Sequence, residues 1–276
     1  MTLDFSDKGK VQVIMHDYIK NIIDEAGPLC TGVASSPAST FLFEVNPNST
    51  ALPKKDADRF HTFVAKLLFV SKRARPDILT AVAFLTTRVK SPDTDDNGKL
   101  TRVIKYLQAT PLLHLTLQSN SSRIIKWRVD GSFAVHNDLK SHTGGTFTMG
   151  KGSIYSSSTR QKLNTRSSTE AELVAVDDMM PRILWTRLFL ASQGYRTTTT
   201  LFQDNMSAMQ LENNGRKSCG KRTRHLNIRF FFVTDRIKAG DLSVVHEPTE
   251  DMVADFFTKP LQGSIFRRFR KIILNE

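Results

Sequence analysis

The order of strand-like and helix-like segments after residue 122 is the feature that most narrows the folds open to this chain. Three successive segments have the pattern of strands joined by glycine-containing or polar turns: RIIKWRVDGSF, TGGTFTMGKG and SIYSSSTRQKL. A helix is predicted from about residue 168, and we expect Pro181 to kink or restart it. The remaining predicted elements are a strand at 197–203, a short helix in MSAMQLEN, a helix at 226–238, a strand at 242–248 and a helical region from about 250. This order predicts a mixed α/β fold with one central sheet.

The first 122 residues have a different pattern. Alternating apolar residues around a glycine-containing turn predict a β-hairpin at 1–16, followed by a helix in DYIKNIIDEAG. A loop rich in Pro, Ser and Asn covers 28–53, and helical patterns follow at about 59–74, 77–90 and 98–109. The polar SNSS at 119–122 is the best candidate boundary. We therefore predict a mainly helical region ahead of the α/β domain.

The net charge of the chain indicates which classes of binding partner to expect. The formal charge of +12 favours a polyanion, either nucleic acid or an acidic membrane, although a merely soluble basic protein is the alternative. Apolar runs such as ILTAVAFL are too short or too interrupted by charge to span a membrane, and the N-terminus lacks the apolar core of a secretory signal. Cys30 and Cys219 are far apart, which fits a reducing, intracellular setting without a disulfide framework or zinc site.

Four acids stand at the ends or starts of predicted elements. Asp130 follows the apolar IIKWRV, Glu172 lies just inside the long helix, Asp204 ends the fourth strand and Asp255 follows the last strand. Strand ends and adjacent helix starts can converge on one patch of an open sheet. Converging acids repel unless cations neutralise them, and two divalent ions about 3.5–4 Å apart would also clamp a phosphodiester. Oxygen-only ligands favour Mg²⁺ or Mn²⁺ over zinc.

Each acid taken alone has a structural explanation. Asp204 suits a helix N-cap, Asp130 suits a turn in DGS, and Asp255 suits a solvent-facing helix position. Only the four acids taken together, in their order along the chain, indicate a catalytic site.

The helix start in TRSSTEAELVAVDD allows two capping registers. Thr169 can cap the helix with Glu172 as its partner, or Ser167 can do so with Glu170. Only the second register leaves Glu172 able to point at the sheet.

Five motifs in order resemble the ribonuclease H domain that closes the Pol polyprotein of copia-type LTR retrotransposons: VDGSF, SSTEAEL, QDNMSA, KRTRHLNIRFFF and PTEDMVADFFTKPL. The match is dense over 125–276. The segments FVAKLLFVSKRARPDILTAVAFLTTRVKSP and RVIKYLQATP resemble the connection between the reverse transcriptase core and ribonuclease H. The implied fold is a ribonuclease H-like mixed five-stranded sheet with helices on both faces, preceded by a mainly helical thumb/connection-like region. The implied regions are the end of the reverse transcriptase (1–27), a loop or linker (28–58), the thumb/connection-like region (59–122) and the ribonuclease H-like domain (123–276).

The resemblance implies a Mg²⁺-dependent endonuclease that uses two metal ions, with Mn²⁺ as an alternative, to hydrolyse the RNA strand of RNA–DNA hybrids during reverse transcription. The family's catalytic and metal-binding acids fall on Asp130, Glu172, Asp204 and Asp255. Asp251 and Glu170 are weaker rivals to Asp255 and Glu172. No YxDD-type motif occurs in the sequence, so a polymerase active site is not expected. The resemblance implies no small-molecule cofactor.

Small polar and basic residues are the expected contacts to the hybrid. The candidates are Ser132, Arg160, Lys162, Ser168, Asn205, Arg222, Arg224 and His225. The serines and the asparagine stand beside the acids and suit contacts to 2′-hydroxyl groups. Basic residues suit salt-dependent phosphate contacts, and Lys217, Lys221, Lys72, Arg73 and Arg75 extend that set. The role of His225 stays open between phosphate binding and helix capping, and His246 is a candidate for assisting product release.

The expected partners are the RNA–DNA hybrid and the rest of the Pol polyprotein, including its reverse transcriptase core, with no membrane. The expected location is intracellular, in a cytoplasmic virus-like particle or the nucleus. A catalytically decayed nucleic-acid-binding remnant and a structural module for the polymerase are the alternatives. A transposase-type nuclease places its glutamate last, whereas the glutamate comes second here.

Overall fold

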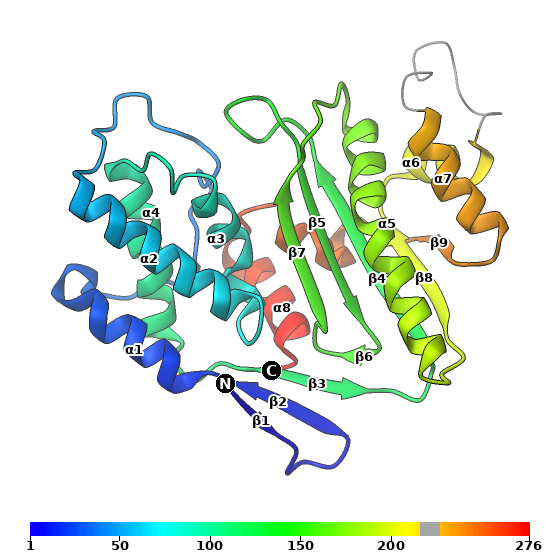
Figure 1. Cartoon of the computed structure of the whole chain (residues 1–276), viewed down its shortest axis with the longest axis horizontal. Coiled ribbons are helices and arrows are strands. Elements are labelled where there is room, and N and C mark those ends of the chain that lie inside the picture. Colours follow the sequence, from blue (N-terminus) through cyan, green and yellow to red (C-terminus); the bar gives the residue numbers. More distant parts are fainter. Residues whose placement is uncertain (216–226) are drawn as a thin grey trace. The chain divides into compact units, whose positions relative to one another are not determined.

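The chain divides into two compact units. The computed structural model describes residues 1–215 and 227–276 (Figure 1). The first unit comprises 1–119, 151–156 and 259–276, and the second comprises 120–150 and 157–258. Residues 259–276 therefore group with the N-terminal region, and the four regions proposed from the sequence stay predictions.

The first unit combines a small sheet of order β1-β2-β3-β6 with helices. Its elements are β1 (Thr2–Asp4), β2 (Lys10–Ile14), α1 (His16–Ala26), η1 (Gly27–Cys30), α2 (Lys54–Ser71), η2 (Pro76–Ile78), α3 (Leu79–Thr86), α4 (Thr94–Ala109), β3 (Leu115–Ser119), β6 (Gly150–Lys151) and α8 (Gly263–Leu274). β1 and β2 pair antiparallel, so the predicted hairpin is present. The three predicted helical patterns appear as α2, α3 and α4. α2 and α4 each bury one apolar stripe, whereas α3 is buried on all sides, from Leu79 to Leu85.

Arg75 is part of the core of the first unit rather than of its surface. Its fully buried guanidinium bonds the Asp77 carboxylate at 2.9 and 2.8 Å, and the Tyr106 hydroxyl donates to the same carboxylate at 2.7 Å. The prediction that Arg75 contacts phosphate is therefore wrong, because its charge is already neutralised out of water. Lys72 and Arg73, proposed with it, are exposed.

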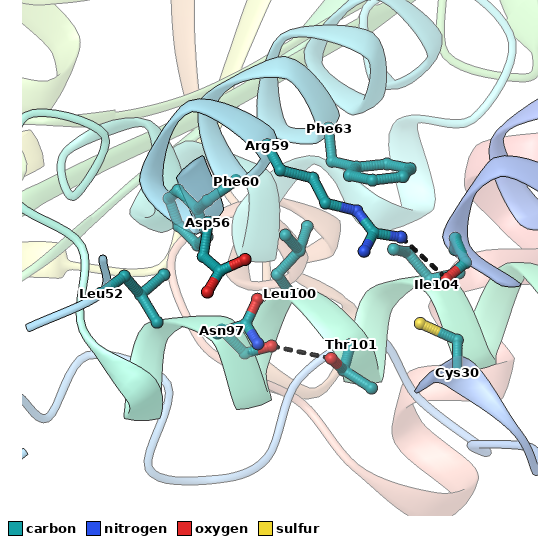
Figure 2. A pocket seen from close by; sticks show the side chains of 11 residues that line it. Cys30, Leu52, Asp56, Arg59, Phe60, Phe63, Asn97, Leu100, Thr101 and Ile104 are labelled. Carbon is teal, nitrogen blue, oxygen red and sulfur yellow. Dashed lines mark hydrogen bonds between the residues drawn. The ribbon is translucent and has the colours of Figure 1, made fainter. Parts of the chain in front are cut away.

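A cavity of about 180 Å³ lies among α2, α4 and the end of α1 in the same unit (Figure 2). Cys30, Phe60, Phe63 and Leu100 are among the side chains that line it. The Arg59 guanidinium at its edge donates to the carbonyl oxygens at the end of α1 at 3.1 and 3.0 Å. The cavity wall is thus held by bonds that complete the end of a helix.

The second unit contains the predicted five-stranded mixed sheet, in the order β7-β5-β4-β8-β9. Its elements are β4 (Ile124–Ser132), β5 (His142–Thr148), β7 (Tyr155–Arg160), α5 (Ser168–Ser192), β8 (Thr198–Gln203), α6 (Met206–Asn214), α7 (Asn227–Lys238), β9 (Ser243–His246), η5 (Thr249–Asp251) and η6 (Val253–Phe257). β4 is central, antiparallel to β5 and parallel to β8, and β8 is parallel to β9. The fold class expected from the sequence is confirmed.

Helical segments cover both faces of this sheet. α5 runs along β4 in Figure 1 and covers the face that carries the buried Trp127 and Val129. The 3₁₀ segment η6 packs on the opposite face, beside Gly144 of β5. No helix among the described residues is long and apolar enough to cross a membrane.

Of the two outcomes expected at Pro181, a restart of the helix is wrong, and a kink stays a prediction. α5 is assigned as one helix from Ser168 to Ser192. Met179, Met180 and Ile183 flank the proline and are buried. Their burial offsets the cost of about 3 kcal/mol for a proline inside a helix.

Candidate active site

Asp130 and Asp204 lie side by side because two neighbouring strands end together. In the parallel pair of β4 and β8, Arg128 is opposite Phe202. Two residues further on, the same register brings Asp130 level with Asp204, and the even positions share one face of the sheet. Both acids therefore stand at the carboxyl end of the sheet, on the face covered by η6.

Asp255 reaches this point from η6. A Cβ atom at Gly144 would lie 2.5 Å from Thr258 Cγ2 and 3.0 Å from the Ala254 carbonyl oxygen. Glycine at this position of β5 therefore lets the backbone of η6 approach the sheet closely. This approach carries Asp255 to the end of β4.

The three aspartates form one group. Asp130, Asp204 and Asp255 each offer a carboxylate oxygen, and these atoms all lie within 4.8 Å of one another. Asp130 and Asp255 are buried, whereas Asp204 is half-buried and leaves the group accessible from one side. Three carboxylates at this spacing form a hard, oxygen-only donor set that suits Mg²⁺ or Mn²⁺.

Glu172 stands beside this group but is not a member of it. Its Oε2 accepts a hydrogen bond of 3.1 Å from the backbone N–H of Gly131, which directly follows Asp130. A Cβ atom at Gly131 would lie only 2.4 Å from the Ala171 carbonyl oxygen. The glycine therefore lets the start of α5 approach β4 closely enough for this bond.

The register of the helix start follows the second alternative. The Ser167 hydroxyl accepts from the Glu170 N–H at 3.2 Å, and Glu170 Oε2 accepts from the Arg166 N–H. Glu170 is thus used in capping, and Glu172 faces the sheet. Asp251, the rival to Asp255, is exposed and lies outside the acid group.

Glu247 is a further acid near the end of the sheet, and it is neutralised. Both of its carboxylate oxygens accept from Arg128, at 2.6 and 2.7 Å. Because a bidentate pair with arginine satisfies the carboxylate, Glu247 is held as a structural ion pair.

Two threonines hold the aspartates, and the sequence reasoning missed both. The buried Thr258 hydroxyl donates to Asp130 Oδ2, and Thr249 Oγ1 donates to Asp204 Oδ2 at 2.9 Å. Thr258 lies inside the motif FFTKPL, so the only sequence signal was its position three residues after Asp255. A hydrogen bond to one oxygen fixes how a carboxylate turns, which matters for metal ligands.

The residues proposed to contact 2′-hydroxyl groups differ in their surroundings. Ser132 is buried at the end of β4, and its hydroxyl has no hydrogen-bond partner among the described residues. Asn205 caps α6, accepting at 3.1 Å from the N–H groups of Ser207 and Ala208. Ser168 is exposed in the first turn of α5. Of the three, Ser132 alone has a hydroxyl that is both buried and without a partner among the described residues.

His142, the cross-strand neighbour of Ser132, forms its hydrogen bonds with other side chains. His142 lies opposite Ser132, and its ring nitrogens contact His136 Nε2 at 2.9 Å and the Ser158 hydroxyl at 2.7 Å. Burial lowers the pKa of His142 to about 3 and that of His136 to about 4. The pair is therefore neutral at physiological pH and acts as polar packing.

The basic candidates are dispersed. Arg160 pairs with Asp138 at 3.3 Å on the surface, and Lys162 is exposed. His246 is exposed on β9, next to Gln203. The remaining basic candidates, Lys217, Lys221, Arg222, Arg224 and His225, lie outside the described residues.

A buried acid supports the strand that presents Asp204. Glu212 of α6 is fully buried and lies 2.8 Å from the side-chain amide of Gln203, with the amide oriented so that its nitrogen donates. Burial raises the pKa of Glu212 to about 8. At neutral pH the folded protein therefore keeps a proton that the unfolded chain releases.

Glu212 should make stability depend on pH. Because its pKa is higher in the folded state, its stabilising contribution is complete below about 4.5 and is lost as the pH rises to about 8. Over this pH range, the unfolding free energy of the wild type should decrease with pH, whereas that of Glu212→Gln should not show this decrease. The difference should be up to about 1.4 kcal/mol per pH unit. Urea denaturation of both proteins across this range measures the difference, and parallel pH profiles would contradict the assignment.

The chain is similar in sequence to parts of transposon proteins. It is 30% identical over 251 residues to the retrovirus-related Pol polyprotein from transposon RE2 of Arabidopsis thaliana, covering 90% of this chain and 17% of the relative. The corresponding protein from transposon RE1 is 30% identical over 247 residues, 88% of this chain and 16% of the relative. That from transposon TNT 1-94 of Nicotiana tabacum is 26% identical over 216 residues, 78% of this chain and 16% of the relative. The chain thus spans only 16–17% of the length of these relatives.

No protein-family model matches the chain. Among solved structures, it is similar to LC11-RNase H1 isolated from compost, with 15% identity over 48% of this chain and 91% of that chain and a TM-score of 0.36. It is also similar to Prototype Foamy Virus protease-reverse transcriptase, with 9% identity over 54% of this chain and 19% of that chain and a TM-score of 0.33.

Proposed function

We propose that this chain, a relative of the Pol polyproteins of copia-type retrotransposons, hydrolyses the RNA strand of RNA–DNA hybrids as a ribonuclease H. The observation that carries the proposal is the convergence of Asp130, Asp204 and Asp255, remote in sequence, on one accessible point. The order of the acids along the chain supports it, because the glutamate follows the third strand of the sheet. Such an order is expected of a ribonuclease H and not of a transposase-type nuclease.

The donor set fits divalent metal ions. Asp130, Asp204 and Asp255 would hold them, and Glu172, fixed beside Asp130 through Gly131, is the proposed fourth ligand. Bound Mg²⁺ ions would supply a lowered pKa for the attacking water and charge stabilisation for the leaving 3′ oxygen. Without cations, the buried carboxylates would repel one another strongly.

The chain's own residues orient this set. Thr258 donates to Asp130 and Thr249 to Asp204, so two of the carboxylates are turned before any ligand arrives. Asn205 caps α6 directly after Asp204 and fixes the direction in which the chain leaves β8. Preorganised ligands lower the reorganisation needed for catalysis.

Selection of RNA is proposed to rest on small polar groups near the acids. Ser132 lies two residues after Asp130, and its hydroxyl has no partner among the described residues, so we include it among the proposed contacts to 2′-hydroxyl groups. Ser168 and Asn205 are proposed to extend these contacts, and the exposed basic residues to contact phosphates. The proposed partners are the hybrid and the remaining Pol polyprotein with its reverse transcriptase core, inside the cell in a virus-like particle or the nucleus.

The direct test is an assay of the purified chain on end-labelled substrates. With Mg²⁺, we expect cleavage of the RNA strand of a hybrid into products with 5′-phosphate and 3′-hydroxyl ends, and no cleavage of single-stranded RNA or duplex DNA. EDTA should abolish cleavage, because the carboxylates alone cannot activate water. Hybrid binding without cleavage would favour the decayed, binding-only alternative, and cleavage that persists in EDTA would contradict the metal role.

A further inference from the structure

Three aromatic side chains lie exposed at the end of α5 that is remote from the acid group. Trp185, Phe189 and Tyr195 expose 56%, 47% and 59% of their surface. Trp185, Leu188 and Phe189 lie on one side of α5, and Tyr195 follows its end; we call these four residues the aromatic face. At a rise of 1.5 Å per residue, Trp185 lies about 20 Å along α5 from Glu172. The proposed catalytic chemistry does not use these residues.

The rings are held in place by the helix. Trp185 and Phe189 are one turn apart and stack in parallel, with ring centroids 5.1 Å apart and planes at 7°. Tyr195 follows Gly194, which has a positive φ of 84° and ends α5. The Tyr195 N–H donates to the Leu190 carbonyl at 2.9 Å, which turns the chain back against the last turn. The Trp185 and Phe189 rings are thus stacked on one side of α5, and the backbone at Tyr195 is held against the last turn.

The surroundings of the aromatic face carry positive charge. Residues 179–203 contain Arg182, Arg187 and Arg196 but no Asp or Glu. Arg123 joins this end of the unit, because its carbonyl oxygen accepts from the Thr198 N–H at 3.2 Å. Arg182 stands one turn before Trp185 on the same side of α5, and Arg196 follows Tyr195. An exposed aromatic surface next to arginines is complementary to a polyanion that also exposes ring faces.

The aspartate that approaches this surface is already neutralised. Asp241 pairs with Arg187 at 3.1 Å and with Arg236 at 3.3 Å. One carboxylate is therefore paired with two guanidinium groups. The sum of these three charges is still positive.

We propose that the aromatic face binds single-stranded nucleic acid, RNA or DNA, by stacking bases on Trp185, Phe189 and Tyr195. Phosphates would lie against the surrounding arginines. A duplex presents phosphates and groove edges but keeps its base faces inside, so it cannot use the rings in this way. The arginines also favour a polyanion over an apolar protein partner. This site does not depend on the proposed nuclease activity.

Tryptophan fluorescence provides a direct readout. The chain has two tryptophans, of which Trp127 is fully buried and Trp185 is exposed. Adding an oligothymidylate or oligouridylate of about 12 nucleotides to the whole chain in EDTA should quench the exposed tryptophan. A DNA duplex of the same length should not. Because EDTA removes metal ions and neither probe is a hybrid, the result is independent of hybrid cleavage.

Variants then separate stacking from general charge attraction. By anisotropy of a labelled oligothymidylate, the double substitution of Trp185→Ala with Phe189→Ala should weaken binding about tenfold or more. Trp185→Phe should remove the quenching but keep most of the affinity, since it keeps a ring. Phe5→Ala is the matched control, because Phe5 is 64% exposed in the other unit and should bind like the wild type.

Two outcomes would overturn the proposal. One is unchanged affinity in the double variant, which would mean that the rings take no part. The other is equal quenching by duplex and single strand, which would mean that binding depends on charge attraction and not on base stacking.

Discussion

Asp204→Asn is expected to reduce cleavage of the RNA strand of a hybrid by about a thousandfold or more, which corresponds to about 4 kcal/mol of transition-state stabilisation. The substitution removes one negative charge and one metal-binding oxygen from the group of three aspartates. Asparagine keeps a carbonyl oxygen that can still accept from Thr249, so the local backbone should not move. Asp204 is half-buried at the end of a strand, and its loss should cost little stability.

Hybrid binding by Asp204→Asn should persist, because phosphate contacts lie elsewhere and one repelling charge is gone. Filter binding in EDTA beside single-turnover cleavage in Mg²⁺ measures both quantities. Asp251→Asn is the matched control: Asp251 is a nearby exposed acid outside the group, and its substitution should leave cleavage unchanged. Equal loss of binding and cleavage in Asp204→Asn would count against a metal role.

Gly131→Ala is expected to have the second largest effect, on both stability and activity. A methyl group at this position would lie 2.4 Å from the Ala171 carbonyl oxygen and 2.8 Å from the Glu172 backbone nitrogen. Both atoms belong to the backbone of α5, so no side chain can turn aside. Either the helix moves away from β4, or the strand end twists, and the bond from Gly131 to Glu172 is lost in both cases.

The expected cost is about 2–4 kcal/mol of unfolding free energy, in the range of severe overpacking. Cleavage should fall about a hundredfold or more at temperatures where the variant is still folded, because Glu172 and Asp130 lose their relative position. Gly98→Ala is the control, since Gly98 lies within α4 and a methyl group there meets nothing within 4 Å. It should stabilise the protein by about 0.5–1 kcal/mol. A Gly131→Ala protein as stable and active as the wild type would contradict the close approach of α5 to the sheet.

The sequence was most informative where apolar periodicity and turn residues agree. The five strands of the central sheet, the hairpin at the N-terminus and the long helix all lie close to their predicted ranges. The four acids were found because each stands where an element begins or ends. The helix does not restart at Pro181, because burial of Met179, Met180 and Ile183 outweighs the local effect of the proline.

Other features needed the fold. Arg75 looked like a surface cation in the sequence, yet it pairs with Asp77 in the core. Nothing local distinguishes Glu247 from Asp255, but the strand register brings Arg128 to Glu247 and leaves Asp255 with the other aspartates. Thr258 likewise acquires its role only when η6 lies against β5.

The sequence by itself determined the kinds of element and their order, because these follow from the period of apolar residues and from turn chemistry within short stretches of chain. It also showed that four acids stand near the ends of these elements. Only the tertiary structure decided which acids meet. That outcome depends on the parallel register of β4 and β8. It also depends on two glycines: Gly131 lets the backbone of α5 approach one face of the sheet, and Gly144 lets η6 approach the other. Such contacts join residues 40 to 114 positions apart, from Gly131 with Ala171 to Gly144 with Thr258, and no local pattern encodes the distance between them.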